Sequence, residues 1–236
     1  MSDTNVKKQQ RAVTWLRVLY PLWAVVGIFG IALVPSAILV SGDAAATANN
    51  IVTNELFLRL GIAAMLVASL IQVAVAIYLY DLFKVISKKA SALIVIFALL
   101  GVPIAMFNVI NQIAPILLQS GADYLSVFSA DQLNSLSTFF LNLNTQGLVI
   151  ASIFWGLWLF PLGYLAYKSS YFPKAIGVVV ILAGFGYLFD SFAKIIFPGY
   201  PDAVSAILSI FYTGEIVFIL WLIFRGAKLS GGNINS

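Results

Sequence analysis

The sequence predicts an all-α polytopic membrane protein, a bundle of six transmembrane helices with short interfacial helices on its external side. Of its 236 residues, 61% are hydrophobic and 9% are charged, whereas a soluble domain carries roughly 25% charged residues. Long apolar runs alternate with short polar segments. Eleven of the 13 Lys and Arg residues fall in four clusters beside these runs: Lys7, Lys8, Arg11 and Arg17; Lys84, Lys88 and Lys89; Lys168 and Lys174; Arg225 and Lys228. Six crossings place every cluster on the cytoplasmic side, as the positive-inside bias requires.

The first span is expected from about Val18 to Val40, a run of 23 residues without a charge. This run exceeds the apolar core of a secretory signal, which is about 7–15 residues long, so we interpret it as a retained span. The loop from Ser41 to Asn54 is rich in Ala. It is predicted to form a short surface helix capped by Asp43.

The second span, from Leu56 to about Tyr80, returns to the cytoplasmic side, and its uncharged part contains one amide, Gln72. The third span, from Ala90 to about Leu118, crosses outward again. It contains Pro103 and Pro115, and each proline is expected to kink the helix because it lacks a backbone N–H.

An external stretch from Ser120 to Ser137 leads into the fourth span, which ends near Tyr167. Within this stretch, Ser129 and Gln132 have the spacing of a capping box. No residue from Gln132 to Tyr167 is charged. An uncharged helix of that length measures about 54 Å at about 1.5 Å per residue, more than the roughly 30 Å hydrocarbon core. We therefore expect this helix to begin above the membrane.

The fifth span is expected from Ala175 to Phe197, and the sixth from Ala203 to Phe224. Between them, the sequence Pro198, Gly199 and Pro201 forces a turn. The sixth span returns the C-terminus to the cytoplasmic side.

These boundaries predict three parts: a cytoplasmic tail over residues 1–17, the six-helix transmembrane domain over 18–224 and a second cytoplasmic tail over 225–236. The polar segments from Lys7 to Arg11 and from Ser230 to Ser236 are expected to be flexible. Both termini are expected in the cytoplasm of a multi-pass protein of the cell inner (plasma) membrane.

Aromatic and small residues fit this topology. The aromatic residues expected at the inner interface are Trp15, Tyr20, Tyr78, Tyr80, Tyr164, Tyr167, Tyr171 and Trp221. The small residues expected to allow close contacts between helices are Gly27, Gly30, Gly156, Gly163, Gly177, Gly184 and Gly186.

The chain contains no Cys and no His. Disulfides and thiol catalysis are therefore excluded, and the usual general base near neutral pH and the commonest metal ligand are missing. We expect no metal and no cofactor. The net charge is +4, and the basic residues lie beside the spans. Contact with anionic lipids therefore explains them better than binding to a nucleic acid does. The expected partners are the lipid bilayer and a small-molecule or lipid ligand, and the oligomeric state stays open.

Two basic residues, Arg59 and Lys194, fall outside the four clusters and are expected at the external face, close to Glu55 and Asp190. A charge in hydrocarbon costs roughly 2.5–3.5 kcal/mol, so these groups are expected to face the bundle interior or a wet cavity. An ion pair between Arg59 and Asp190 is one interpretation, and contact with a ligand is the other. Glu55 and Arg59 are also four residues apart, which suits a pair on one helix.

Glu215 stands 12 residues into the 22-residue sixth span, with no basic residue expected at the same depth. Three interpretations stay open for it. It is a protonated carboxyl hydrogen-bonded to a neighbouring helix, a proton- or cation-coupled site, or a ligand contact.

Six amides are expected in the external half of the bundle: Asn108, Asn111 and Gln112 in the third span, and Asn142, Asn144 and Gln146 in the fourth. The spacing of the first three places them on one helix face, and Asn142 and Gln146 also share a face. Each amide alone is typical of hydrogen bonding between helices, but six at one depth exceed that need. We hypothesise a polar cavity open to the outside, lined by these amides with Arg59, Tyr187, Asp190 and Tyr212, and with Glu215 at its floor.

Five segments resemble one known family: Phe154 to Tyr164, Tyr171 to Lys174, Gly184 to Phe192, Ser41 to Asn49 and Ser120 to Leu125. Together they resemble the mostly bacterial integral membrane proteins called DUF4386, a domain of unknown function. The likeness extends from the first span to Glu215. It implies a membrane protein and carries no biochemical activity with it. The family pattern has a His near Asn144 and another near Trp158; this chain has neither, so no role of those histidines transfers to it.

The first functional hypothesis is the binding or transport of a small polar or amphipathic ligand that enters from outside, with Arg59 engaging an anionic head group. The alternative is a non-catalytic membrane scaffold or sensor subunit whose polar residues set the helix register. An intramembrane enzyme using Asp190 and Glu215 as acid and base is less favoured, because no nucleophile with an adjacent base is visible.

Overall fold

A computed structural model describes residues 3–197 and 199–229. The chain is 86% helical, and no strand occurs among those residues. The elements are α1 (Asp3–Ile28), a π-helical turn (Phe29–Leu33), α2 (Val34–Ile38), α3 (Ala44–Thr53), α4 (Glu55–Phe83), α5 (Lys88–Asn108), α6 (Ile110–Leu118), a short 3-10 turn (Asp123–Leu125), α7 (Ala130–Lys168), α8 (Lys174–Ile196) and α9 (Asp202–Arg225). The all-α prediction is confirmed.

Six helical stretches of the described chain are long and apolar enough to cross a membrane. They are Asn5–Ile38, Glu55–Phe83, Lys88–Leu118, Ala130–Lys168, Lys174–Ile196 and Val204–Arg225. Each contains a window of 18 residues with at most two charged side chains, and about 20 residues of helix span the hydrocarbon core. The protein is therefore a multi-pass membrane protein, as expected.

The contacts divide the chain into two compact units. Unit 1 takes in the described residues of Met1–Leu22, Ile71–Val102 and Ile150–Ser236, and unit 2 takes in Trp23–Leu70 and Pro103–Val149. All four basic clusters belong to unit 1, whereas Arg59 and the six amides belong to unit 2. Each unit has its own packing.

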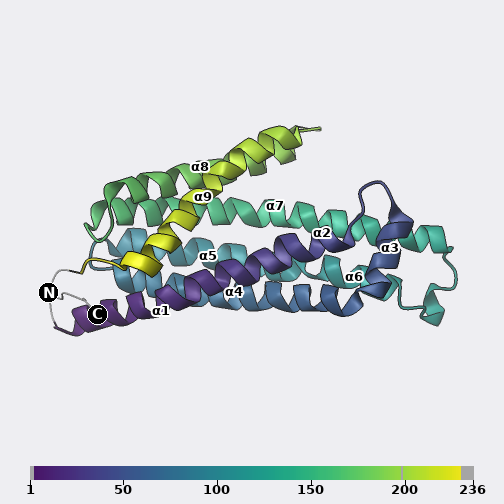
Figure 1. The fold of residues 1–236 in the computed structure, drawn as a ribbon, viewed down its shortest axis with the longest axis horizontal. Helices are drawn as coiled ribbons and strands as arrows, with labels where there is room; N and C mark the ends of the chain where they lie inside the picture. Colours follow the sequence, from purple (N-terminus) through teal and green to yellow (C-terminus); the bar gives the residue numbers. More distant parts are fainter. Residues whose placement is uncertain (1–2, 198, 230–236) are drawn as a thin grey trace. The chain divides into compact units, whose positions relative to one another are not determined.

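In unit 1, α8 and α9 form an antiparallel pair with extensive contact along their length (Figure 1). Helix α7 packs against α8 through glycines. A Cβ on Gly163 would lie 2.6 Å from the carbonyl oxygen of Gly177, and one on Gly156 would lie 3.0 Å from that of Gly184. The absence of side chains here lets the two backbones touch, as expected for close helix packing in membranes.

Helix α1 begins at Asp3, so the expectation of a flexible tail over Lys7 to Arg11 is wrong. This first part of α1 is helical because it packs within unit 1: Leu16 is fully buried and Ala12 almost so. The other tail expected to be flexible, Ser230 to Ser236, lies outside the described residues.

Two side chains of α1 cap the ends of other helices in unit 1. The amide nitrogen of Gln9 donates to the carbonyl oxygen of Leu82, in the last turn of α4. The guanidinium of Arg17 donates to the carbonyl of Ile223, in the last turn of α9. The last carbonyls of a helix have no partner within it and carry partial negative charge, so an amide or a cation stabilises them.

Two of the aromatic residues expected at the inner interface are buried within the protein. Tyr20 has no exposed surface and hydrogen-bonds to Glu215, and Tyr171 is buried and its hydroxyl accepts from Gln9. An interfacial tyrosine and a buried one have the same sequence signature, because each needs a polar partner for its hydroxyl.

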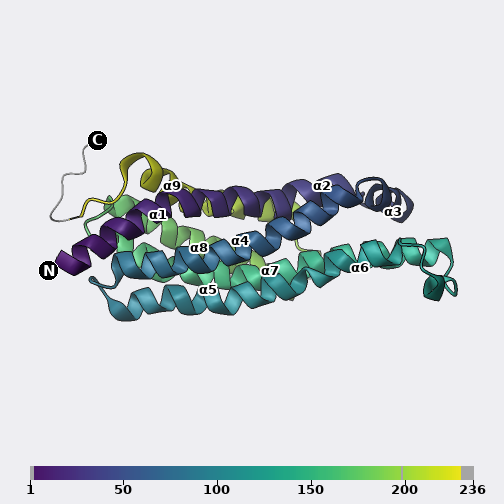
Figure 2. The ribbon, with the colours of Figure 1, turned by 90° about the horizontal axis from the view of Figure 1, so that it is seen from below.

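Unit 2 has a hydrophobic core of residues from five helices: Val34, Ile38, Ile51, Leu58, Ile116 and Leu141. Helix α3, in this unit, runs across the end of α2 instead of continuing it (Figure 2). The Asp43 carboxylate accepts a hydrogen bond from the backbone of Ala46 at 2.8 Å and so caps α3. The predicted surface helix and its cap are confirmed.

The third span is interrupted once, at Val109, between α5 and α6. Pro103 and Pro115 lie inside α5 and α6 rather than at the break. At the break, the backbone N–H of Gln112 donates to the carbonyl of Val109, three residues back. The break thus lies between the two prolines, and the kinks expected at Pro103 and Pro115 stay a prediction.

Helix α7 begins at the predicted capping box. The Ser129 hydroxyl accepts from the backbone of Gln132 at 3.3 Å, and the Gln132 side chain accepts from the backbone of Ser129 at 2.8 Å. The helix then continues for 39 residues. The predicted start and the predicted excess length of this helix are both confirmed.

Candidate functional site

Arg59 forms an ion pair on its own helix. Its Nε lies 2.7 Å from Oε1 of Glu55, one turn earlier in α4, and both side chains are about half exposed. The same-helix pair that the spacing predicted is confirmed. Arg59 is therefore not a buried charge, and its partner in the structure is Glu55.

Asp190 is buried in α8 and binds two groups through Oδ2. The Lys194 ammonium donates to it at 2.7 Å, and the Tyr212 hydroxyl of α9 donates at 2.8 Å. The ring of Tyr212 stacks on that of Tyr187, with centroids 4.0 Å apart. Asp190 thus ties α8 to α9, and its charge is balanced by a lysine four residues away. The expected grouping of Tyr187, Asp190 and Tyr212 is present within unit 1.

Glu215, in α9, accepts a hydrogen bond from the hydroxyl of Tyr20 at 2.7 Å. The ring of Tyr20 contacts the rings of Trp158 and Phe218, each with a centroid distance of 6.0 Å. The sequence interpretation of a carboxyl hydrogen-bonded to a neighbouring helix is confirmed in its geometry. Sequence reasoning did not identify Tyr20 as the partner.

Of the six predicted amides, four form one cluster and two are exposed outside it. Asn108 and Gln112 reach across to Asn144 of α7: Asn108 Nδ2 donates to the Asn144 carbonyl at 2.8 Å, and Gln112 Nε2 donates to Asn144 Oδ1 at 3.0 Å. Asn144 Nδ2 donates to the Asn108 carbonyl at 3.2 Å. The amide of Asn111 donates to Asn108 Oδ1. These four residues form the amide cluster.

Asn142 and Gln146 do not join the amide cluster. Both are exposed on α7, whereas Asn144, between them, is buried. Residues two apart on a helix point in different directions, so the burial of Asn144 turns its neighbours away from the helix contact. The six predicted amides therefore do not share one site.

A groove borders the amide cluster. It is shallow and wide open, has a volume of about 570 Å³, and is lined by Pro103, Ile104, Phe107, Asn108, Asn111 and Gly147. Gly147 explains its form, because a Cβ there would collide with the side-chain amide of Asn108. Only a glycine lets Asn108 reach across α7 at this point. The two amides of this groove were predicted from the sequence, whereas Gly147 and the apolar walls were not.

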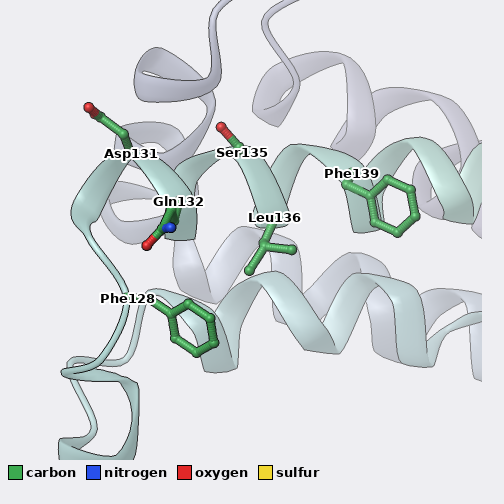
Figure 3. A pocket seen from close by; sticks show the side chains of 6 residues that line it. All are labelled: Phe128, Asp131, Gln132, Ser135, Leu136 and Phe139. Carbon is green, nitrogen blue, oxygen red and sulfur yellow. The ribbon is translucent and has the colours of Figure 1, made fainter.

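A second groove lies at the start of α7 (Figure 3) and is lined by Phe128, Asp131, Gln132, Ser135, Leu136 and Phe139. Figure 3 shows Gln132 and Leu136 directed to the same side as Phe128, with Asp131 and Ser135 directed away. This groove was not predicted from the sequence. Leu136 and Phe139, in the first turns after the capping box, are three residues apart and so share one face of the helix. This apolar spacing is the sequence pattern from which the groove could have been predicted.

The described residues contain no group of three or more Asp or Glu side chains that could hold a metal ion. The polar residues assigned from sequence form an ion pair on α4, an amide cluster in unit 2, and the Asp190 and Glu215 contacts in unit 1. A cavity joining all of these groups stays a prediction.

The family model for the domain of unknown function DUF4386 matches residues 18–226. The chain belongs to the DUF4386 family. This confirms the resemblance found in the sequence. The DUF4386 chain is also similar to an uncharacterized protein of Archaeoglobus fulgidus, with 31% identity over 163 residues that cover 68% of this chain and 80% of that protein. No solved structure matches the chain.

Proposed function

We propose that this DUF4386 protein binds an uncharged amphipathic molecule, a hydroxyl group joined to an apolar chain, in the groove beside the amide cluster. The observation that carries the proposal is the combination of apolar walls with one amide oxygen that is free to accept a hydrogen bond. Such a combination of a mostly apolar lining and a few placed polar groups is typical of ligand sites.

The walls supply the apolar contact. Phe107 is 75% exposed, and with Pro103 and Ile104 it forms the side of the groove on α5. The volume of about 570 Å³ falls within the range of roughly 300–1,000 Å³ that is typical of small-molecule sites. An alkyl chain therefore fits the groove by size and by chemistry.

The polar contact is Asn111. The amides of Asn108 are occupied, since its Nδ2 donates to Asn144 and its Oδ1 accepts from Asn111. Asn111 is half-buried and uses its Nδ2 for that bond, whereas its Oδ1 has no hydrogen bond among the described residues. An acceptor left in this position is best satisfied by a donor on the ligand, such as a hydroxyl group.

The residues that line the groove indicate that the ligand is uncharged. No charged side chain lines the groove, and a charge without a partner is costly in such surroundings. This argues against the anionic head group that the sequence had suggested for Arg59. Arg59 is exposed and already paired with Glu55.

We place this groove toward the extracytoplasmic side of the plasma membrane, with both termini in the cytoplasm. Support comes from α5 and α7, whose basic residues Lys88, Lys89 and Lys168 all lie at the end away from the amide cluster. The chain has no natural Cys. Single cysteines introduced at Ser129 and at Ser87 would therefore report the side of each loop by labelling with a membrane-impermeant maleimide. Labelling of Ser87→Cys in intact cells would overturn the orientation.

The binding proposal is tested by adding monoolein, which has an oleoyl chain and free hydroxyls, to the protein in detergent micelles. Methyl oleate, with the same chain and no hydroxyl donor, is the control compound. Binding is measured by native mass spectrometry and by the shift in unfolding temperature. We expect monoolein to bind and methyl oleate to bind less tightly, by about two- to tenfold, because one neutral hydrogen bond is worth roughly 0.5–1.5 kcal/mol. Equal binding of the two compounds would refute the role of the amide oxygen.

Three variants test the position of the site. Asn111→Leu removes the acceptor, and Asn142→Leu makes the same change at an exposed amide outside the groove. Monoolein should stabilise the wild type and Asn142→Leu equally and Asn111→Leu less, each measured against its own unfolding temperature. Phe107→Ala, in an exposed wall residue that the fold does not need, should also weaken binding. If all four proteins respond alike, the groove is not the site.

The alternative function is a non-catalytic scaffold or sensor subunit. The amide cluster favours it, because most of its hydrogen-bonding groups are used between helices, as in helix packing. A wild-type protein that binds neither compound, while Asn144→Ala destabilises it, would support the scaffold.

A further inference from the structure

A hydrogen bond between two buried side chains joins α1 to α9 in unit 1. The hydroxyl of Tyr20 donates to Oε1 of Glu215 at 2.7 Å, with Tyr20 fully buried and Glu215 5% exposed. Glu215 lies ten residues before Arg225, the end of α9. Ten residues of helix measure about 15 Å at about 1.5 Å per residue, which is half of the roughly 30 Å hydrocarbon core. The carboxyl therefore lies well within the apolar stretch of α9 and is buried in the protein.

No cation of the described residues forms an ion pair with this carboxyl. The ion pairs among the described residues are Glu55–Arg59, Asp81–Lys84 and Asp190–Lys194, and none includes Glu215. The nearest cation on α1, Arg17, donates to the carbonyl of Ile223.

The elements packed around Glu215 contribute few other groups that titrate. They are Tyr20 and Arg17 on α1, Tyr187, Asp190 and Lys194 on α8, and Tyr212 on α9 itself. Helix α7 contributes Trp158, which does not titrate and whose ring contacts that of Tyr20. Lys194 is committed to Asp190 at 2.7 Å.

The ligand that fits this place is a proton. A metal cation such as Ca²⁺ or Mg²⁺ takes about six or more oxygen ligands, and the described part of the chain has no cluster of three acidic residues. An organic cation needs a cavity, whereas Trp158 and Phe218 are fully buried against Tyr20. A proton needs only one carboxyl oxygen and no space.

We infer that Glu215 and Tyr20 form a proton-binding site within the membrane, at the contact between α1 and α9. Glu215 takes a proton from water and returns it to water, changing between a neutral carboxylic acid and a carboxylate. The hydroxyl of Tyr20 keeps its own proton and donates its hydrogen bond to the carboxyl in both forms. An ionised carboxylate in hydrocarbon needs a partner that balances its charge, whereas the neutral acid does not. The two forms therefore favour different packing of α9 against α1. The site is independent of the groove in unit 2.

The chain permits a direct test, because it contains only two glutamates, Glu55 and Glu215. Protein labelled with 13C-glutamate gives two side-chain carboxyl signals in an NMR spectrum of the protein in lipid bilayers. Glu55→Gln, a change at an exposed side chain, leaves the signal of Glu215 alone without altering the site. We expect this signal to move between the positions of the acid and the carboxylate as pH is varied. A signal that stays at one position over the whole pH range in which the protein is folded would overturn the inference.

Two further measurements distinguish a bound proton from a bound metal cation at Glu215. Tyr20→Phe should shift the midpoint of the Glu215 titration, whereas Tyr78→Phe, the same change at a tyrosine that stacks on Trp15, should leave it unchanged. Sodium, potassium or magnesium added at constant pH should not move the signal. If a cation moves it and pH does not, Glu215 is a cation site and the inference is wrong. Asn111→Leu should leave the titration as it is, so failure of the groove proposal would not affect this result.

Discussion

Asn108 and Asn144 each donate a side-chain hydrogen bond to the backbone carbonyl of the other, at 2.8 and 3.2 Å, and so join the third and fourth spans by a reciprocal pair. The carbonyl of Asn108 lies at the break between α5 and α6, where the regular pattern of helix hydrogen bonds is interrupted. The break therefore supplies one of the two acceptors that hold the spans together.

Asn144→Ala should destabilise the protein by about 1–3 kcal/mol, because it removes one donor and one acceptor and leaves buried polar groups of Asn108 and Gln112 without a partner. The free energy of unfolding is measured by titration with a denaturing detergent. The matched control is Asn142→Ala, an exposed amide on the same helix, which should change stability by less than about 0.5 kcal/mol. Equal effects of the two changes would show that the reciprocal pair contributes nothing.

Tyr20→Phe should cost about 1–3 kcal/mol in unfolding free energy, since it removes the hydroxyl that Glu215 accepts from and leaves a buried carboxyl without a donor. Thermal unfolding in micelles, followed by circular dichroism, measures the effect. Tyr78→Phe serves as the control, because no hydrogen bond of the Tyr78 hydroxyl occurs in the described residues. The assigned hydrogen bond would be disproved by a Tyr20→Phe protein as stable as the control.

Gly163→Ala should lower stability by about 1–3 kcal/mol, because its Cβ would lie 2.6 Å from the carbonyl oxygen of Gly177 and force α7 away from α8. Gly27→Ala is the matched control. No atom lies within 4 Å of a Cβ at Gly27, so the alanine there should stabilise the helix by roughly 0.5–1 kcal/mol. The two substitutions are thus expected to have opposite signs in the same unfolding experiment.

Ser129→Ala should destabilise the start of α7 by about 1 kcal/mol through loss of the cap on the Gln132 backbone. Hydrogen–deuterium exchange measured by mass spectrometry should show faster exchange confined to the first turns of the helix. Ser135→Ala, an exposed serine further along the same helix, should leave the exchange unchanged. Exchange that is uniform in both variants would mean that the helix does not depend on its capping box.

Features encoded by residues close in sequence were predictable. The caps at Asp43 and Ser129 and the Glu55–Arg59 pair each depend on residues three or four positions apart, and that spacing fixes their geometry on a helix. The number of spans was predictable for a similar reason, since the length and polarity of each run decide it.

Features that depend on distant residues were not predictable from one sequence. Tyr20 was assigned to the membrane interface, and nothing local reveals that it meets Glu215, 195 positions later. The same limit applies to Gln9, which was placed in a flexible tail and instead caps the end of α4. Helical spacing alone also does not predict that Asn144 is buried while Asn142 is exposed. The contact of Asn144 with the third span decides which face of α7 is buried.

The close approach of α7 and α8 bears on how the chain is made. Five residues, 169–173, separate the two helices, and the glycine contacts between Gly163 and Gly177 and between Gly156 and Gly184 use only segments already synthesised when α8 is complete. Helices that have entered the bilayer associate through such backbone contacts. α7 and α8 can therefore leave the insertion machinery as one helical hairpin. α9, which is synthesised last, then packs against this hairpin.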